Sequence, residues 1–212
     1  MVEVIELPLD NRSTLHVDVS TLLVDPHITE LVYQYVSSLA EMYPDNPFHN
    51  FEHASHVTMS VTKLLSRIVA PSDMDFTDNA QASAKLHDHT YGITSDPLTQ
   101  FACVLSALIH DVDHPGVSNA TLVAEGDKLM KTYGDKSLAE QNSVDQAWDL
   151  LMSEEYQPLV AVLCRDDSEL SRLRQLVVNS VMATDIMDPD LKKLRNGRWE
   201  KAFHNTDRKS VV

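Results

Sequence analysis

Apolar side chains recur every three or four residues along most of this chain, the spacing that places them on one face of an α-helix. The first such stretch follows Asp25-Pro26 and should end before Pro44, because the residue preceding a proline is disfavoured in a helix. The second should run from Phe51 to about Val69. Its expected inward face consists of Val57, Val61, Leu64, Leu65 and Ile68.

The most apolar predicted helix lies in the middle of the chain. A polar stretch begins at Pro71, and Pro97 then opens the segment PLTQFACVLSALIHDVDHPG, which should end at Pro115-Gly116. Its apolar residues lie nearly all round a helix, which is typical of a helix buried at the centre of a domain.

The remaining pattern is also helical. Ser137 and Glu140 match a capping box that would open a helix, another helix should run from Ser168 to about Met187, and a short one should pass through Leu191. We therefore expect an all-α fold, a compact multi-helix bundle. Residues 1–24 would be a leader or linker, and residues 25–212 would form the domain.

Composition agrees with a helical chain and restricts its partners. Glycine contributes only 5 of 212 residues. The 32 acidic residues outnumber the 17 basic ones, and the resulting net charge of −15 repels nucleic acid and would also repel a small phosphate ester. An anionic substrate would therefore need a local reversal of charge, which divalent metal ions supply strongly.

The two cysteines and the N-terminus indicate an intracellular chain. Cys103 and Cys164 both fall in apolar helical patterns, so we expect core residues rather than a disulfide or a cysteine-based zinc site. The acidic N-terminus lacks the basic region of a signal peptide, and no apolar run approaches the roughly 20 residues of a membrane span. We expect a soluble, cytoplasmic protein; the pattern leaves its oligomeric state open.

Two histidine clusters carry the candidate chemistry, FHNFEHASHV and IHDVDHPGVSN. His49 and His53 are four residues apart, as are His110 and His114, so each pair would share one face of a helical turn. For one histidine alone, a helix-capping or solvated side chain would be the preferred interpretation. Two clusters with matched spacing favour a site.

Asp111 makes that site a metal site. It follows His110 directly at the polar end of an apolar helix, where burial of an unpartnered carboxylate would be costly. An imidazole nitrogen beside a carboxylate that can bridge two cations is what a metal site between helices requires. The pair His87-Asp88 lacks this setting, and we expect it to lie in a solvated connection.

Three segments resemble a known family. FHNFEHASHV resembles the HN-x-x-H-A signature of class I cyclic-nucleotide phosphodiesterases, IHDVDHPGVSN resembles their HD-x-D-H-P-G-x-x-N signature, and VMATDI is similar to a segment usually written LATD. Their order and spacing agree over roughly residues 28–204. The resemblance implies an HD-type metal phosphohydrolase that hydrolyses 3′,5′-cyclic nucleotides, cAMP, cGMP or both, to 5′-monophosphates in signal transduction.

The resemblance also implies roles for individual residues. His53, His110 and Asp111 would ligate a tightly held zinc-like ion, and Asp111 would also reach a second, looser Mg²⁺ or Mn²⁺. His49 would be the general acid that protonates the departing O3′. His49 and Asp111 would thus face the substrate, a small cyclic nucleotide.

Other positions match residues that support the metals in that family. His114, Glu140 and Thr184 would hold metal-bound waters, although a capping-box role for Glu140 stays open. Asp113 and Asp185 would more readily serve helix ends or hydrogen-bond networks than ligate a metal.

The sequence departs from the family pattern at several positions, of which His56 replaces a frequent Asp, Phe48 replaces a common Tyr, and two further departures are larger. Family members often read E-N-H-H where this chain reads EQNS at residues 140–143. The further Asp that completes the first metal site, and the glutamine and aromatic residue that bind the purine, have no match before Val212. We therefore expect a domain that is incomplete at its C-terminus, with weaker metal binding where water replaces the fourth ligand.

Two alternatives stay open at this point. The chain could be a non-catalytic remnant that binds metal or a partner, or another HD-type nucleotide phosphohydrolase. The choice between cAMP and cGMP is also left open, because the purine-reading residues have no match.

Overall fold

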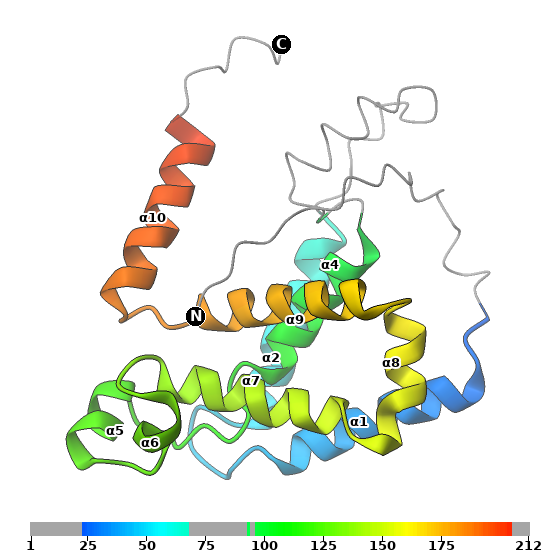
Figure 1. Ribbon diagram of the computed structural model, residues 1–212, viewed down its shortest axis with the longest axis horizontal. Coiled ribbons are helices and arrows are strands. Elements are labelled where there is room, and N and C mark those ends of the chain that lie inside the picture. The colour runs from blue at the N-terminus through cyan, green and yellow to red at the C-terminus, as the bar shows by residue number, and fades with distance from the viewer. Residues whose placement is uncertain (1–22, 68–92, 94–95, 205–212) are drawn as a thin grey trace.

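The computed structural model describes residues 23–67, 93 and 96–204. These residues form helices joined by turns and contain no strand, so the all-α expectation is confirmed (Figure 1). The helices are, in chain order, α1 (Pro26–Glu41), α2 (Phe51–Leu65), α4 (Pro97–Ile109), α5 (Asn119–Glu125), α6 (Leu129–Tyr133), α7 (Leu138–Leu151), the 3-10 helix η2 (Glu154–Tyr156), α8 (Gln157–Leu163), α9 (Asp167–Met182) and α10 (Pro189–His204). No helix among the described residues combines the length and apolar character needed to cross a bilayer.

The first two helices begin where polar side chains cap them. Asp25 accepts a hydrogen bond from the backbone N–H of His27 at 2.8 Å, with Pro26 at the first helical position, and α1 ends before Pro44 as predicted. Asn50 caps α2 in the same way by accepting from the N–H of His53 at 2.9 Å. This cap fixes the first turn of α2, which carries His53.

The predicted inward face of α2 is only partly correct. Ala54 is the fully buried residue of this helix, whereas Leu64 is 57 % exposed and Met59, in the same helix, is 60 % exposed. The physical reason is that α2 buries its first turns, where small and aromatic side chains allow close packing, and its last turns extend past the core. Ile68 and the His87-Asp88 pair lie outside the described residues.

Helix α4 lies at the centre of the molecule, as its apolar composition predicts, and packs against α2 and α9. Its helical bonding ends at Ile109, earlier than the expected end at Pro115. Two tight turns follow, in which Val112 N–H donates to Ile109 O and His114 N–H donates to Asp111 O. Val112 is fully buried, so this turn is anchored in the core while its polar residues lie at the core's edge.

Tyrosine hydroxyls tie the core helices together. Tyr35 of α1 donates to the carbonyl of Ala147 in α7 at 3.0 Å, and Tyr43 donates to the carbonyl of Leu108 in α4 at 2.6 Å. Cys164 is buried and Cys103 is half-buried, and both thiols are free, in agreement with the predicted absence of a disulfide.

The capping box predicted at the start of α7 does not form. Ser137 adopts φ 47° and ψ 45°, and its hydroxyl donates to Asp185 Oδ2 at 2.7 Å instead of capping the helix. Glu140 accepts from the side chain of Asn119 at 2.8 Å. Both side chains of the predicted capping box therefore form hydrogen bonds with residues distant in sequence, Asp185 and Asn119.

The periodic pattern misses the short helices α5, α6, η2 and α8, which are too brief to show a full amphipathic repeat. The cap signals of α5 are nevertheless present, with Ser118 accepting from Thr121 N–H and Gly126 ending the helix at φ 66°.

Figure 1 shows α8 linking α7 to α9 at one end, while α10 leads away from the other helices. Helix α9 ends at Met182, earlier than the expected Met187.

A buried ion pair joins α4 to α9. Asp96 caps α4 by accepting from Leu98 N–H, and it binds Arg172 of α9 and the Thr99 hydroxyl. Burial alone would raise the pKa of Asp96, but the hydrogen bonds and charge of Arg172 outweigh it and hold that pKa below its usual value.

We expect Asp96→Asn to lower the free energy of unfolding by about 3 kcal/mol at pH 7, because asparagine still caps α4 but leaves Arg172 buried without a counter-charge. Since the pKa of Asp96 is lower in the folded state, its contribution is complete above the unfolded pKa, about pH 4, and is lost as the pH falls through the folded pKa. The difference between wild type and variant in urea denaturation should therefore shrink below about pH 4.

Asp190→Asn is the matched control, because the Asp190–Lys136 pair is exposed to solvent. It should leave the unfolding free energy close to that of wild type. Equal losses in both variants would contradict the importance of the buried pair.

Candidate metal centre

The two histidine clusters meet where α2 begins and α4 ends. His53 comes from the first turn of α2, and His49 from the turn that precedes it. His110 and Asp111 directly follow α4, and His114 closes the same turn. All five predicted residues are thus brought together. Their ligand atoms form two groups, one of His53, His110 and Asp111 and one of His49, Asp111 and His114, each with its atoms within 4.8 Å of one another.

In the first group, a nitrogen of each histidine lies close to the same oxygen of Asp111. His53 Nε2 lies 3.6 Å from Asp111 Oδ2, and His110 Nε2 lies 3.2 Å from the same oxygen. His110 Nδ1 lies 3.0 Å from the carbonyl oxygen of Ala107. Because a carbonyl only accepts, Nδ1 must carry the proton, and the Nε2 lone pair of a neutral His110 faces Asp111.

Asp111 Oδ2 is buried and accepts no hydrogen bond of good geometry, which is costly for a carboxylate. Burial alone would raise the pKa of Asp111, but neighbouring His110 outweighs it and lowers that pKa. Burial likewise opposes protonation of His110, yet the Asp111 carboxylate raises the His110 pKa overall. The buried Asp111 carboxylate is therefore stabilised by a positive charge beside it, either a proton on His110 or a metal ion.

A divalent cation fits this donor set better than a proton. Two imidazole nitrogens and one carboxylate oxygen are ligands that Zn²⁺ and similar ions accept. Burial lowers the pKa of His53, with Asp111 opposing the shift only in part, so His53 is neutral at pH 7 as a metal ligand must be. The hydrogen bond to Ala107 orients His110 in the way that ligand histidines are commonly held.

The second group is less suited to hold a metal directly. The rings of His49 and His114 are stacked, with centroids 3.8 Å apart and planes 14° from parallel, so one ion could not lie in both ring planes. The backbone N–H of Gly116 donates to His114 Nδ1 at 3.0 Å. Burial, followed by the proximity of His49, lowers the pKa of His114 to about 4. His114 is therefore neutral, with its proton on Nε2, and can donate a hydrogen bond but not a lone pair.

Asn46, which the sequence reasoning missed, holds the two stacked histidines in register. Its side-chain nitrogen donates to the carbonyl of His49 at 2.8 Å and to the carbonyl of His114 at 3.3 Å. Asn50 in turn donates to Asn46 O at 2.9 Å. The turn signal in PDNPFHN was visible in the sequence, but the contact with a residue 68 positions away was not.

Phe48 forms an apolar wall over the site. Its ring centroid lies 4.5 Å from that of His53 and 5.0 Å from that of His49, and its side chain is 61 % exposed. Part of the ring therefore covers the two histidines, and part faces solvent at the edge of the site.

Glu140 and Thr184, which were expected to hold metal-bound waters, differ in their surroundings. Glu140 is half-buried near Asp111, and burial, opposed by its hydrogen bond from Asn119, raises its pKa. Thr184 is exposed, and its hydroxyl donates to Val181 O at 2.6 Å, which satisfies a carbonyl at the end of α9. Asp185 serves a hydrogen-bond network, as expected.

The EQNS segment, which departs from the family pattern, binds the turn that carries the site. Asn142 donates to Asp113 Oδ2 at 3.0 Å, and Ser143 donates to Val112 O at 2.6 Å. Asp113 adopts φ 53°, a strained value for a residue with a side chain, and its N–H donates to Met42 O. Asp113 thus belongs to a hydrogen-bond network, as predicted, and the changed residues keep the turn anchored to α7.

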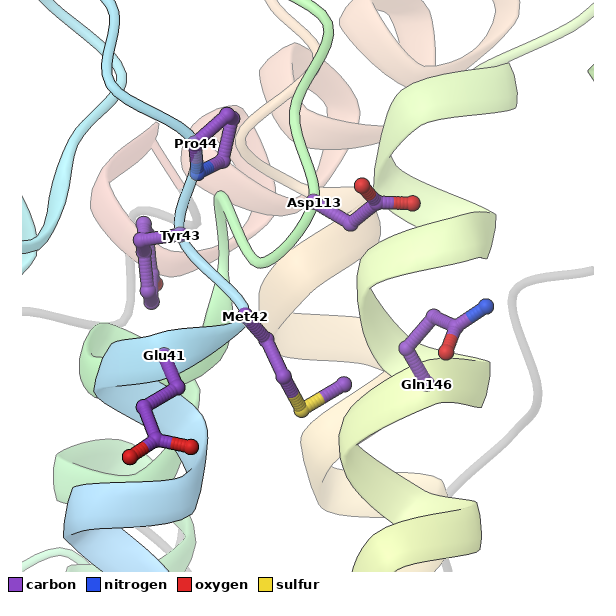
Figure 2. Close-up of a pocket in the computed structure, with 6 residues that line it drawn as sticks. All are labelled: Glu41, Met42, Tyr43, Pro44, Asp113 and Gln146. Carbon is purple, nitrogen blue, oxygen red and sulfur yellow. The ribbon is translucent and has the colours of Figure 1, made fainter.

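An open hollow of about 410 Å³ lies behind this turn, between the end of α1 and α7 (Figure 2). Its lining residues are Glu41, Met42, Tyr43, Pro44, Asp113 and Gln146. None of the candidate metal ligands lines it.

Known proteins resemble the chain over most of its length. It is 31 % identical over 176 residues to the human cGMP-inhibited 3′,5′-cyclic phosphodiesterase 3A, covering 72 % of this chain and 15 % of that protein. It is 30 % identical over 169 residues to the Drosophila melanogaster 3′,5′-cyclic-AMP phosphodiesterase, isoform F, covering 79 % of this chain and 21 % of that protein. The chain thus spans about a fifth or less of these relatives.

The fold also resembles a crystal structure of the phosphodiesterase domain of the Salpingoeca rosetta rhodopsin phosphodiesterase. The TM-score is 0.61 at 22 % identity, covering 84 % of this chain and 51 % of that one. The family model for 3′,5′-cyclic nucleotide phosphodiesterase matches residues 48–201, which include both histidine clusters and the VMATDI segment. The chain therefore belongs to the 3′,5′-cyclic nucleotide phosphodiesterase family.

Proposed function

We propose that this chain carries the metal-binding part of a phosphodiesterase site that hydrolyses 3′,5′-cyclic nucleotides, cAMP, cGMP or both, to 5′-monophosphates. The observation that carries the proposal is the convergence of the nitrogens of His53 and His110 on the buried oxygen of Asp111. Family membership and the names of the curated relatives support the choice of substrate.

We assign the tighter cation to His53, His110 and Asp111 and propose Zn²⁺ there, because two nitrogen donors favour zinc over magnesium. A looser Mg²⁺ or Mn²⁺ would share Asp111, whose carboxylate has a second oxygen to offer. Bound there, divalent cations would activate a water molecule and neutralise charge on the phosphoryl oxygens. This local positive charge would also offset the repulsion of an anionic substrate by a chain of net charge −15.

His49 is the proposed general acid, delivering a proton to the departing O3′ while His114 stacks on its ring. Asn46 fixes the backbone of both histidines, so the acid stays beside the metal ligands. His114, neutral with a proton on Nε2, would donate a hydrogen bond to a metal-bound water. Phe48 limits access of bulk water to His49 and His53 from its side.

Turnover of cyclic nucleotides tests the catalytic proposal. Purified protein supplied with Mg²⁺ or Mn²⁺ should hydrolyse cAMP or cGMP, and His49→Ala should lower kcat by about 10²–10⁴-fold, the usual contribution of a general acid. His56→Ala is the matched control, since His56 lies on the exposed side of α2 and should leave kcat unchanged. Metal binding without any turnover would instead support a non-catalytic remnant.

Metal titration tests the ligand assignment separately. His110→Ala should weaken Zn²⁺ binding, measured by competition with a chromophoric chelator, by more than about 100-fold, because it removes a direct ligand. His114→Ala should weaken it less, within the roughly 10–100-fold range of residues that act through others. Thermal unfolding of both variants checks that they are folded, and the reverse order of affinities would exclude the assignment.

A further inference from the structure

Three segments that are distant in sequence meet at the side chain of Asn119. Asn119 is the first residue of α5, five positions after His114. The first turn of α7 and the residues that follow α9 contribute Glu140 and Asp185. Neither the periodic pattern nor the metal-ligand spacing indicates this meeting point.

Both ends of the Asn119 amide are used. Its nitrogen donates to Glu140 Oε2 at 2.8 Å and to Asp185 Oδ2 at 3.2 Å, and its oxygen accepts from the N–H of Ala139 at 3.0 Å. One NH₂ group therefore holds two carboxylates that would otherwise repel each other, while the oxygen fixes the amide to the backbone beside Glu140.

Both oxygens of Asp185 are hydrogen-bonded. It is only 6 % exposed, and its Oδ1 accepts from the N–H groups of Met187 and Asp188 at 3.0 and 3.1 Å. Its Oδ2 accepts from the hydroxyl of Ser137, which is almost fully buried at φ 47°. A non-glycine residue in this conformation is strained by about 1–2 kcal/mol, so the network must hold it there.

One carboxylate of this network, that of Glu140, lies near the candidate metal centre. Among the described residues, the ion pairs formed by Lys and Arg side chains involve neither Glu140 nor Asp185. Glu140 is close enough to both Asp185 and Asp111 for their charges to act on it. A cation at Asp111 would therefore compensate the charge of Glu140, whose Oε2 accepts a hydrogen bond from Asn119.

We propose that Asn119 is a positioning residue that holds the Glu140 carboxylate toward Asp111 and so strengthens cation binding at the centre. Asp185 and Ser137 fix the orientation of Asn119, which links the turn after α9 to the metal site. The inference rests on the proposed function, because it assumes that a divalent cation binds at Asp111.

Calorimetric titration with Mn²⁺ alone tests this role without any measurement of turnover. Asn119→Ala should weaken Mn²⁺ binding by about 10–100-fold. Asn119→Ser, which keeps a small polar group at the start of α5, should give a weakening in the same direction and serves if the alanine variant does not fold. Gln141→Ala is the matched control, because within the described part of the chain the Gln141 amide donates to the backbone carbonyls of Lys136 and Tyr133, and Mn²⁺ affinity should be unchanged.

A second variant separates positioning from general stability. In protein carrying Glu140→Gln, the further change Asn119→Ala should alter Mn²⁺ affinity by less than about threefold, since Asn119 acts through Glu140. Equal weakening with and without Glu140→Gln, or unchanged affinity in folded Asn119 variants, would overturn the inference alone. Wild-type protein that binds no Mn²⁺ would overturn the proposed function as well.

Discussion

The structure around the site depends on one buried oxygen. Asp111 Oδ2 accepts no hydrogen bond, yet it lies within 3.6 Å of the nitrogens of two histidines from different helices. A carboxylate in that setting is stable only if positive charge accompanies it. The convergence of α2 on the end of α4 is therefore both a packing contact and an electrostatic requirement, because neither histidine alone would justify burying Asp111.

The surrounding residues keep that geometry in place without touching the oxygen. Val112 anchors the turn in the core, and Ser143 and Asn142 of α7 bind the turn's backbone and its Asp113 side chain. Asn46 does the same for the histidines on the α2 side. Rigid supports of this kind are needed because a metal site tolerates only small errors in ligand position.

The sequence predicted those features that depend on residues close together in the chain. Apolar periodicity located α1, α2, α4, α7 and α9, and the matched four-residue spacing of the histidines selected residues that the structure brings together. Local signals failed where distant partners competed for the same side chain. Ser137 and Glu140 read as a capping box, but Asp185 and Asn119 take their hydrogen-bonding groups. Likewise, Leu64 fits a helical stripe, yet α2 extends past the core that would bury it.

Gly116, in the H-P-G part of the second cluster, determines the tautomer of His114. At φ 78°, a conformation that favours glycine, its N–H reaches His114 Nδ1. The backbone thereby selects one tautomer of a ring two residues earlier, in which the proton is on Nε2. The turn sequence His114-Pro115-Gly116 thus specifies which ring nitrogen of His114 carries the proton.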